Sequence, residues 1–409
     1  MRSFVQSFEL SQGKWRRLSP FPLELVGTAV FSPSPSGKLL AVVKNDATSA
    51  KDSKKDAGCV IEIWESEGRL VEQIATTGVH GKVLSGTWFG GLSWSPDETK
   101  VVYDEKKKAV EARSFFSKPP VDKDASSVPL PGDQFLYQED WGEKYDGVTR
   151  LGLFVADVDG TGKVEEIQGL AKNLTPGQPR FSKGGTHVVY TAWDCEPRKL
   201  GMIYCYQRPC NLYSAPVDAL LAKMKTLVDG EIEKAVNEED LKAEEEHKCL
   251  CPSWRLARSV RFSPSGDRLV WLSREEGFDT HNGCFRLTSA SWDEQEGTIT
   301  GAPRNLVDVV DVPETEGAFP GLWMQDLPDA CWAPDGSCVY LTSSWGSRYS
   351  VLSVDTESGE VERVVAATVA AGQNPSAGKP EDASASVLAV GKRGVYVAGS
   401  SPNPPAGFA

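Results

Sequence analysis

The residues best suited to chemistry in this chain lie in one short acidic stretch. Glu139, Asp140 and Glu143 surround Trp141 in the sequence Gln-Glu-Asp-Trp-Gly-Glu. Three carboxylates beside an aromatic ring could bind a cationic or amide-bearing ligand at the opening of a cavity in the fold. The alternative is a solvated acidic loop with a buried tryptophan, and the residue types alone favour that alternative.

Motifs for nucleophilic, phosphate or zinc chemistry are missing from the sequence. The serine-hydrolase elbow Gly-x-Ser-x-Gly does not occur, and the nearest string, Gly91-Leu-Ser-Trp-Ser, lacks the second glycine. Phosphate-loop, dinucleotide and His-Glu-x-x-His spacings are also absent. General bases are scarce because there are only four histidines, and His187 is expected to be a packing or edge residue on a strand. We therefore predict no catalytic residue and no cofactor in this chain.

Nine cysteines are scattered along the chain. Their closest grouping is His247-Lys-Cys249-Leu-Cys251, with Cys205 and Cys210 some forty residues earlier. Cys-x-Cys is a poor fit to the spacing of structural zinc sites. We therefore expect reduced thiols and no metal site.

Composition excludes several classes of partner. The net charge of −13 opposes binding to phosphate backbones, so we expect no nucleic-acid partner. The sequence shows neither an apolar run long enough for a membrane helix nor the pattern of a signal peptide. We therefore predict a cytoplasmic protein with no membrane partner.

The elements that must position these residues are indicated by five copies of one pattern: an aromatic residue, a tight turn and an apolar run. The copies begin at Phe31, Trp94, Phe181, Phe262 and Trp332. In four of them proline follows two residues later, where it fixes φ for a turn. The β-branched and aromatic run after each turn is typical of a strand. One hairpin cannot bury its own faces, so the copies must stack.

The spacing of the repeats predicts the architecture. Successive aromatics are 63, 87, 81 and 70 residues apart, whereas a four-stranded propeller blade needs about 40–50 residues. Four further apolar runs, which we take as support for additional blades, lie at residues 60–64, 151–157, 212–218 and 350–355. Together they predict an all-β fold, a β-propeller with seven blades as the central estimate and six to eight as the range.

Three stretches interrupt this pattern. Residues 104–133 have the mixed charge and prolines of a loop, and residues 366–384 are rich in Ala, Gly, Ser and Pro. Residues 219–247 are highly charged and predict a helical insertion exposed to solvent.

Longer strings between the repeats resemble one known family. They include Gly132-Asp-Gln-Phe, Glu139-Asp-Trp-Gly-Glu, Ala192-Trp-Asp-Cys-Glu-Pro-Arg-Lys-Leu-Gly and Gly321-Leu-Trp-Met-Gln-Asp-Leu, together with residues 104–116 and 175–178. These strings are similar to those of acylamino-acid-releasing enzymes, also called acylaminoacyl-peptidases or acylpeptide hydrolases. That family belongs to the prolyl oligopeptidase family of serine peptidases. The resemblance runs over most of the chain in the same order.

The resemblance implies a fold and an activity for the whole enzyme. Family members join an N-terminal β-propeller to a C-terminal α/β-hydrolase domain and remove N-acylated residues from short peptides in the cytosol. The propeller limits the substrates, and some members are homotetramers. The catalytic triad belongs to the hydrolase domain, so no catalytic residue carries over to this chain. The loop with Glu139, Asp140, Trp141 and Glu143 is then expected to face the cavity between the domains, as a substrate gate.

These inferences lead to two hypotheses of different classes. In the first, residues 1–400 form the propeller domain of an acylaminoacyl-peptidase, and residues 401–409 begin a linker to an α/β-hydrolase domain. Such a propeller would filter short N-acylated peptides, would be inactive alone and would join a homo-oligomer in the full-length enzyme. In the second, the chain is a stand-alone propeller that acts as a protein-interaction scaffold.

Overall fold

The structure is a computed structural model of the 409-residue chain. It describes residues 4–5, 7–11, 14–19, 21–24, 26–45, 59–76, 79–81, 83–84, 86, 88–106, 116, 137–205, 207–218, 246–275, 281, 283–364, 384–392, 394–400 and 407–408.

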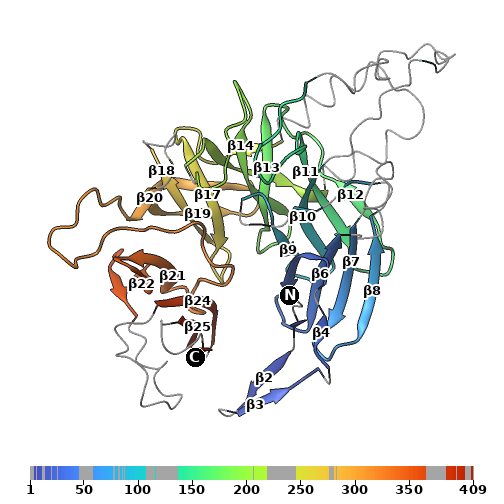
Figure 1. The fold of residues 1–409 in the computed structure, drawn as a ribbon, viewed down its shortest axis with the longest axis horizontal. Coiled ribbons are helices and arrows are strands. Elements are labelled where there is room, and N and C mark those ends of the chain that lie inside the picture. Colours follow the sequence, from blue (N-terminus) through green and yellow to red (C-terminus); the bar gives the residue numbers. More distant parts are fainter. Residues whose placement is uncertain are drawn as a thin grey trace.

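The described residues form antiparallel sheets that follow one another in chain order, which is the arrangement of a β-propeller (Figure 1). The first two large sheets contain β5 (Thr28–Pro33), β6 (Leu39–Asn45), β7 (Cys59–Glu65) and β8 (Leu70–Ala75), then β9 (Leu92–Trp94), β10 (Lys100–Lys106), β11 (Leu151–Asp157) and β12 (Val164–Glu166). The next strands are β13 (Leu174–Phe181), β14 (His187–Asp194), β15 (Cys210–Pro216) and β16 (Lys248–Cys249), then β17 (Leu256–Phe262), β18 (Arg268–Arg274), β19 (Arg286–Asp293) and β20 (Thr298–Val307). A single parallel pairing of Cys210 with Leu256 joins these two sets into one sheet.

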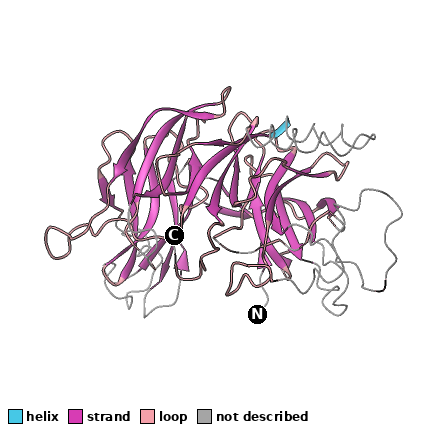
Figure 2. Cartoon of the chain, turned by 90° about the horizontal axis from the view of Figure 1, so that it is seen from above, coloured by secondary structure: helices cyan, strands magenta, loops and turns pink. Residues whose placement is uncertain are grey.

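Smaller sheets begin and end the chain. The last two contain β21 (Cys338–Trp345), β22 (Arg348–Asp355) and β23 (Val361–Arg363), then β24 (Ser384–Gly391), β25 (Gly394–Ser400) and β26 (Gly407–Phe408). Near the N-terminus, β1 (Phe4–Val5) pairs with β4 (Leu23–Glu24), and β2 (Phe8–Ser11) pairs with β3 (Lys14–Arg17). Among the described residues, helical backbone is confined to residues 217–218 (Figure 2).

Four of the predicted turns join two consecutive antiparallel strands, and the fifth, after Trp332, leads into β21, where Trp332 forms an isolated β-bridge with Val339. Every copy closes its turn in the same way: Ser34, Ser95, Ser182, Ser263 or Ala333 accepts a backbone hydrogen bond at 2.9–3.0 Å from the residue three positions later. The acceptor directly follows the aromatic in four copies and lies three residues after Phe31 in the first. Four copies have glycine as the donor residue, with φ between 71° and 81°. Glu98 takes the same left-handed conformation at φ 61° in the remaining copy.

The four additional apolar runs do not mark additional blades. They belong to β7, β11, β15 and β22, and each pairs with the strand that follows a repeat turn. The inference of extra blades from these runs was therefore wrong. A strand buried on both faces and a strand of a separate blade give the same apolar signal, so the pattern could not distinguish them. The number of blades stays a prediction.

The apolar core lies between neighbouring sheets. One cluster packs the sheet of β5–β8 against that of β9–β12, a second packs β9–β12 against β13–β15, and a third packs β13–β15 against β17–β20. The repeat aromatics Trp94 and Phe181 are buried in these clusters, and Trp332 is buried in a further cluster with residues of β17 to β22. Phe31, in contrast, is 48% exposed. First strands also lie side by side, because β13 contacts both β9 and β17.

The interruptions are only partly described. β10 continues to Lys106, so the predicted loop at 104–133 begins later than expected, because Asp104 and Glu105 pair with Leu153 and Gly152 of β11. The predicted helical insertion at 219–247 lies outside the described residues except for 246–247, and the stretch at 366–384 lies outside them except for Ser384. Within the predicted linker at 401–409, Gly407 and Phe408 pair with β25.

Candidate functional site

The acidic loop, residues 137–150, folds on itself through hydrogen bonds. Asp140 accepts the backbone N–H groups of Gly142 at 3.0 Å and Gly147 at 2.7 Å. The backbone N–H of Trp141 reaches the carbonyl of Val148 at 3.3 Å. These bonds from Gly147 and Gly142 hold the pKa of the Asp140 carboxyl below its usual value. Asp140 therefore braces the loop instead of presenting a free carboxylate.

Trp141 anchors the loop in the core. Its side chain is 1% exposed and meets the ring of Phe89 edge-on at 5.2 Å. Phe89 makes two more edge-on contacts, with Tyr145 and Trp193, at 5.1 Å each. Such aromatic contacts stabilise a fold beyond the area they bury. Trp141 does not offer its ring to a ligand in this arrangement.

The other two carboxylates lie nearer to solvent. Glu143 is exposed and the side chain of Glu139 is half-buried. The backbone carbonyl of Glu139 accepts a hydrogen bond from Lys199 Nζ at 3.0 Å, which ties the start of the loop to residues that follow β14. The structure thus brings the four predicted residues into one loop but separates their environments: two carboxylates at the surface, one structural carboxylate and one buried ring.

A chain of hydrogen bonds connects Phe89, on which the loop is anchored, to β13, to β17 and to the segment between β20 and β21. The carbonyl of Phe89 accepts the Gln178 backbone N–H at 2.8 Å, and Gln178 Oε1 accepts the Ser259 backbone N–H at 3.0 Å. Ser259 Oγ in turn accepts the Leu327 backbone N–H at 2.8 Å. We call these four residues the inner relay. It holds the acidic loop in a fixed position relative to β13, β17 and the segment that precedes β21.

The histidines and cysteines singled out from the sequence have ordinary structural roles. His187 is the first residue of β14, as predicted. His247 bonds Tyr190 Oη and the Gln168 carbonyl, both at 2.7 Å. All nine cysteines are free thiols. In the described part of the chain, the thiols near His247 do not form a group with metal-binding spacing.

A different trio does have that spacing: Cys59, His80 and Glu105. Burial raises the pKa of the Cys59 thiol to about 12 and that of the Glu105 carboxyl to about 9, and it lowers the pKa of His80 to about 4. Sequence reasoning missed this group because its members lie more than twenty residues apart and share no motif.

Comparison with known proteins identifies the family. The family model described as the N-terminal domain of acylamino-acid-releasing enzyme matches residues 2–399. The chain belongs to this family. Acylamino-acid-releasing enzyme 1 of Oryza sativa subsp. japonica is 30% identical over 387 residues, which cover 89% of this chain and 46% of that protein. The Arabidopsis thaliana enzyme is 32% identical over 365 residues, which cover 84% of this chain and 43% of that protein.

The chain spans less than half the length of the curated acylamino-acid-releasing enzymes it matches, between 43% and 49%. Among solved structures, an acylaminoacyl peptidase in complex with Z-Gly-Gly-Phe-chloromethyl ketone is 10% identical, with a TM-score of 0.46 and coverage of 92% of this chain and 43% of that one. Among the described residues there is no helix with the length and apolarity to cross a membrane.

Proposed function

We propose that this chain is the peptide-admitting propeller of an acylamino-acid-releasing enzyme. It restricts a hydrolase domain to short N-acylated peptides, from which that domain releases an N-acyl amino acid. The observation that supports this most strongly is the family match over residues 2–399, in a chain that aligns with 46% and 43% of the length of the two plant relatives. The chain alone carries no hydrolytic activity, and the complete enzyme is a cytoplasmic homo-oligomer.

In this proposal the acidic loop is the gate. Glu139 and Glu143 place carboxylates at or near the surface, while Asp140 and Trp141 hold the loop in place from below. A loop held by internal hydrogen bonds and a buried indole is preorganised. Its surface carboxylates therefore have fixed positions that select the peptide, and the loop loses little entropy when the peptide binds. The inner relay extends that rigidity to β13, β17 and the segment that precedes β21.

The ligand chemistry follows from the residue types. An N-acylated peptide presents amide N–H groups and no ammonium at its N-terminus. Ionised carboxylates accept hydrogen bonds from amides strongly. A short, extended peptide can offer these groups to Glu139 and Glu143, whereas the N–H groups of a folded protein are already bonded within its own structure.

The proposal is tested by titrating the 409-residue chain with acetyl-trialanine amide and measuring the dissociation constant calorimetrically. We expect the double variant Glu139→Gln, Glu143→Gln to bind roughly 3- to 10-fold more weakly, which corresponds to one or two hydrogen bonds. The matched control is Glu314→Gln, Glu316→Gln, an exposed acidic pair in another loop, which should bind unchanged. Equal affinities for both double variants would disprove the gate, and tight retention of a folded, acetylated protein would favour a scaffold.

A further inference from the structure

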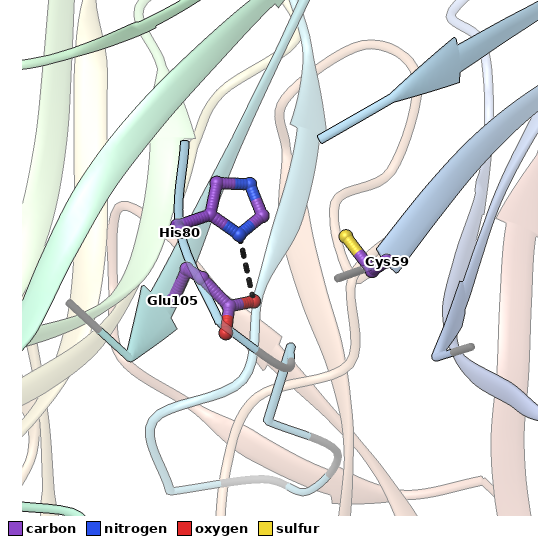
Figure 3. A group of neighbouring side chains, drawn as sticks. All are labelled: Cys59, His80 and Glu105. Atoms are coloured by element: carbon purple, nitrogen blue, oxygen red, sulfur yellow. Dashed lines mark ion pairs between the residues drawn. The ribbon is translucent and has the colours of Figure 1, made fainter. Parts of the chain in front are cut away.

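Three side chains that can bind metals converge in a fully buried position between the first two large sheets (Figure 3). Cys59 is the first residue of β7, Glu105 lies near the end of β10, and His80 lies in the connection from β8 to β9. One ligand atom from each lies within 4.8 Å of the other two. All three side chains are 0% exposed.

The backbone around His80 is fixed by specific contacts. Val83 forms a β-bridge with Glu105, and the Gly81 N–H donates to the Lys106 carbonyl at 3.1 Å. The side-chain amide of Asn45 bonds both the N–H and the carbonyl of Val83, at 3.0 and 3.1 Å. The connection therefore presents the imidazole to Glu105 from a defined position.

The distances within the trio approach those of a metal site. Ligand atoms around a tetrahedral zinc ion stand about 3.3–3.8 Å apart, given metal–ligand bonds of about 2.0–2.3 Å. His80 Nδ1 and Glu105 Oε2 are 3.8 Å apart, so closing around an ion needs only a small movement of the side chains. The Gly81 carbonyl oxygen lies 3.2 Å from Nδ1, where it accepts a hydrogen bond from a protonated Nδ1. When Nδ1 gives up that proton to bind an ion, the same oxygen lies near the fourth ligand position.

The surrounding hydrogen bonds hold the trio in place, and two of them, between His80 Nδ1 and the Gly81 carbonyl and between Cys59 Sγ and Thr76 Oγ1, both at 3.2 Å, would be replaced when an ion binds. His80 Nε2 bonds Tyr103 Oη at 2.8 Å, which fixes the ring and directs Nδ1 toward Glu105. Glu105 Oε1 accepts the Lys106 backbone N–H at 3.0 Å, whereas Oε2 has no hydrogen-bond partner among the described residues. An orphaned carboxylate oxygen in a buried site is costly unless a cation completes it.

We propose that Cys59 Sγ, His80 Nδ1 and Glu105 Oε2 bind one divalent zinc ion, with the Gly81 carbonyl or a water in the fourth position. Thiolate, imidazole and carboxylate are the ligand types that zinc takes in proteins. The thiolate and the carboxylate together carry two negative charges, which a divalent cation neutralises in the buried site. Neighbouring Asp104 takes no part, since consecutive strand residues point to opposite faces. The ion ties β7 to β10 and thereby joins two sheets.

The test uses the 409-residue chain stripped with a chelator and titrated with Co²⁺, a spectroscopic substitute for zinc. We expect one equivalent to bind with a near-ultraviolet thiolate-to-cobalt band and strong visible bands of four-coordinate cobalt, and Zn²⁺ to displace it. Cys59→Ser should remove the thiolate band, and Glu105→Gln should weaken binding at least about 10-fold. Cys251→Ser, which alters an equally buried thiol in another cluster, should leave the band unchanged.

Two results would overturn the proposal: no stoichiometric uptake of Co²⁺ or Zn²⁺ by the folded chain, or a thiolate band that survives in Cys59→Ser. Far-ultraviolet circular dichroism of the metal-free variants shows whether they fold. If Cys59→Ser does not fold, Glu105→Gln decides, because it keeps the shape of the side chain and removes only the charge. Unchanged affinity in Glu105→Gln would then refute the site. The melting temperature of the unaltered chain should also rise on adding zinc.

Discussion

Gln178 Oε1 accepts the backbone N–H of Ser259 at 3.0 Å, a bond that joins β13 to β17, the first strands of the two sets that make up the largest sheet. Both residues have left-handed backbone conformations, with φ of 52° and 63°. Each lies at an irregularity in strand pairing, between Gly177 and Arg180 and between Arg258 and Arg261. The two bulges occupy equivalent places before the repeat aromatics Phe181 and Phe262. The bulges turn the Gln178 side chain and the Ser259 backbone N–H toward each other.

Removing the Gln178 amide should therefore destabilise the propeller. Gln178→Ala orphans the Ser259 N–H and the Thr191 hydroxyl, which donates to the same oxygen at 3.0 Å. We expect a loss of about 2–4 kcal/mol in the free energy of unfolding, measured by urea denaturation. Gln73→Ala, at an exposed strand position, should change it by less than about 0.5 kcal/mol. Equal losses in the free energy of unfolding of the two variants would contradict a stabilising role for the Gln178 hydrogen bonds.

Gly177 marks the closest approach between strand β13 and the anchor of the acidic loop. A Cβ at this position would lie 2.6 Å from the carbonyl oxygen and 2.7 Å from the Cα of Phe89, both backbone atoms that cannot move aside. We expect Gly177→Ala to cost at least about 2 kcal/mol or to prevent folding. Gly201→Ala is the matched control, because its Cβ would meet nothing within 4 Å. Thermal melts compare the two, and similar melting temperatures would count against this close packing.

Trp141 should behave as a structural residue. Its indole is buried against Phe89, so Trp141→Ala should lower the free energy of unfolding by about 3–5 kcal/mol and Trp141→Phe by less. Glu143→Gln, at an exposed position of the same loop, should leave stability unchanged within about 0.5 kcal/mol. Chemical denaturation measures all three. A neutral Trp141→Ala would mean that the ring does not anchor the loop.

The acidic loop should loosen at low pH. Asp140 has a lowered pKa because it accepts the Gly147 and Gly142 N–H groups, so it stabilises the folded state above its unfolded pKa. That contribution is lost as the pH falls through the lower, folded pKa. We expect the protection of the Gly147 amide against hydrogen exchange to fall below about pH 4. Asp140→Asn should flatten this dependence, and Asp146→Asn, at an exposed position of the same loop, should not. Protection that is independent of pH in the unaltered chain would refute this.

Much of the fold could be predicted from local sequence. The turn after Phe262 illustrates this, since Ser-Pro-Ser-Gly determines the hairpin through φ restrictions that act within four residues. The family could be predicted too, from strings such as Ala192 to Gly201. The number of strands per blade could not, because the run at 151–157 has the same pattern whether it continues a sheet or begins another.

The sites were harder to predict because they depend on long-range pairing. Cys59 and Glu105 approach each other only because β7 and β10 belong to sheets that pack face to face. Likewise, no local signal shows that Asp140 would bond Gly147, which makes it a brace instead of a free carboxylate. The buried position of Trp141 agrees with the alternative that the residue types favoured, and a gating role for the loop stays a proposal.

The most direct test of the proposed function is active-site labelling of the purified 409-residue chain with a fluorophosphonate, together with an assay of acetyl-alanine anilide hydrolysis. A propeller that admits peptides for a separate hydrolase domain has no activated serine, so we predict no labelled serine and no turnover. A serine that is labelled and protected by an N-acetylated peptide would contradict the account, because the chain would then contain a catalytic site of its own.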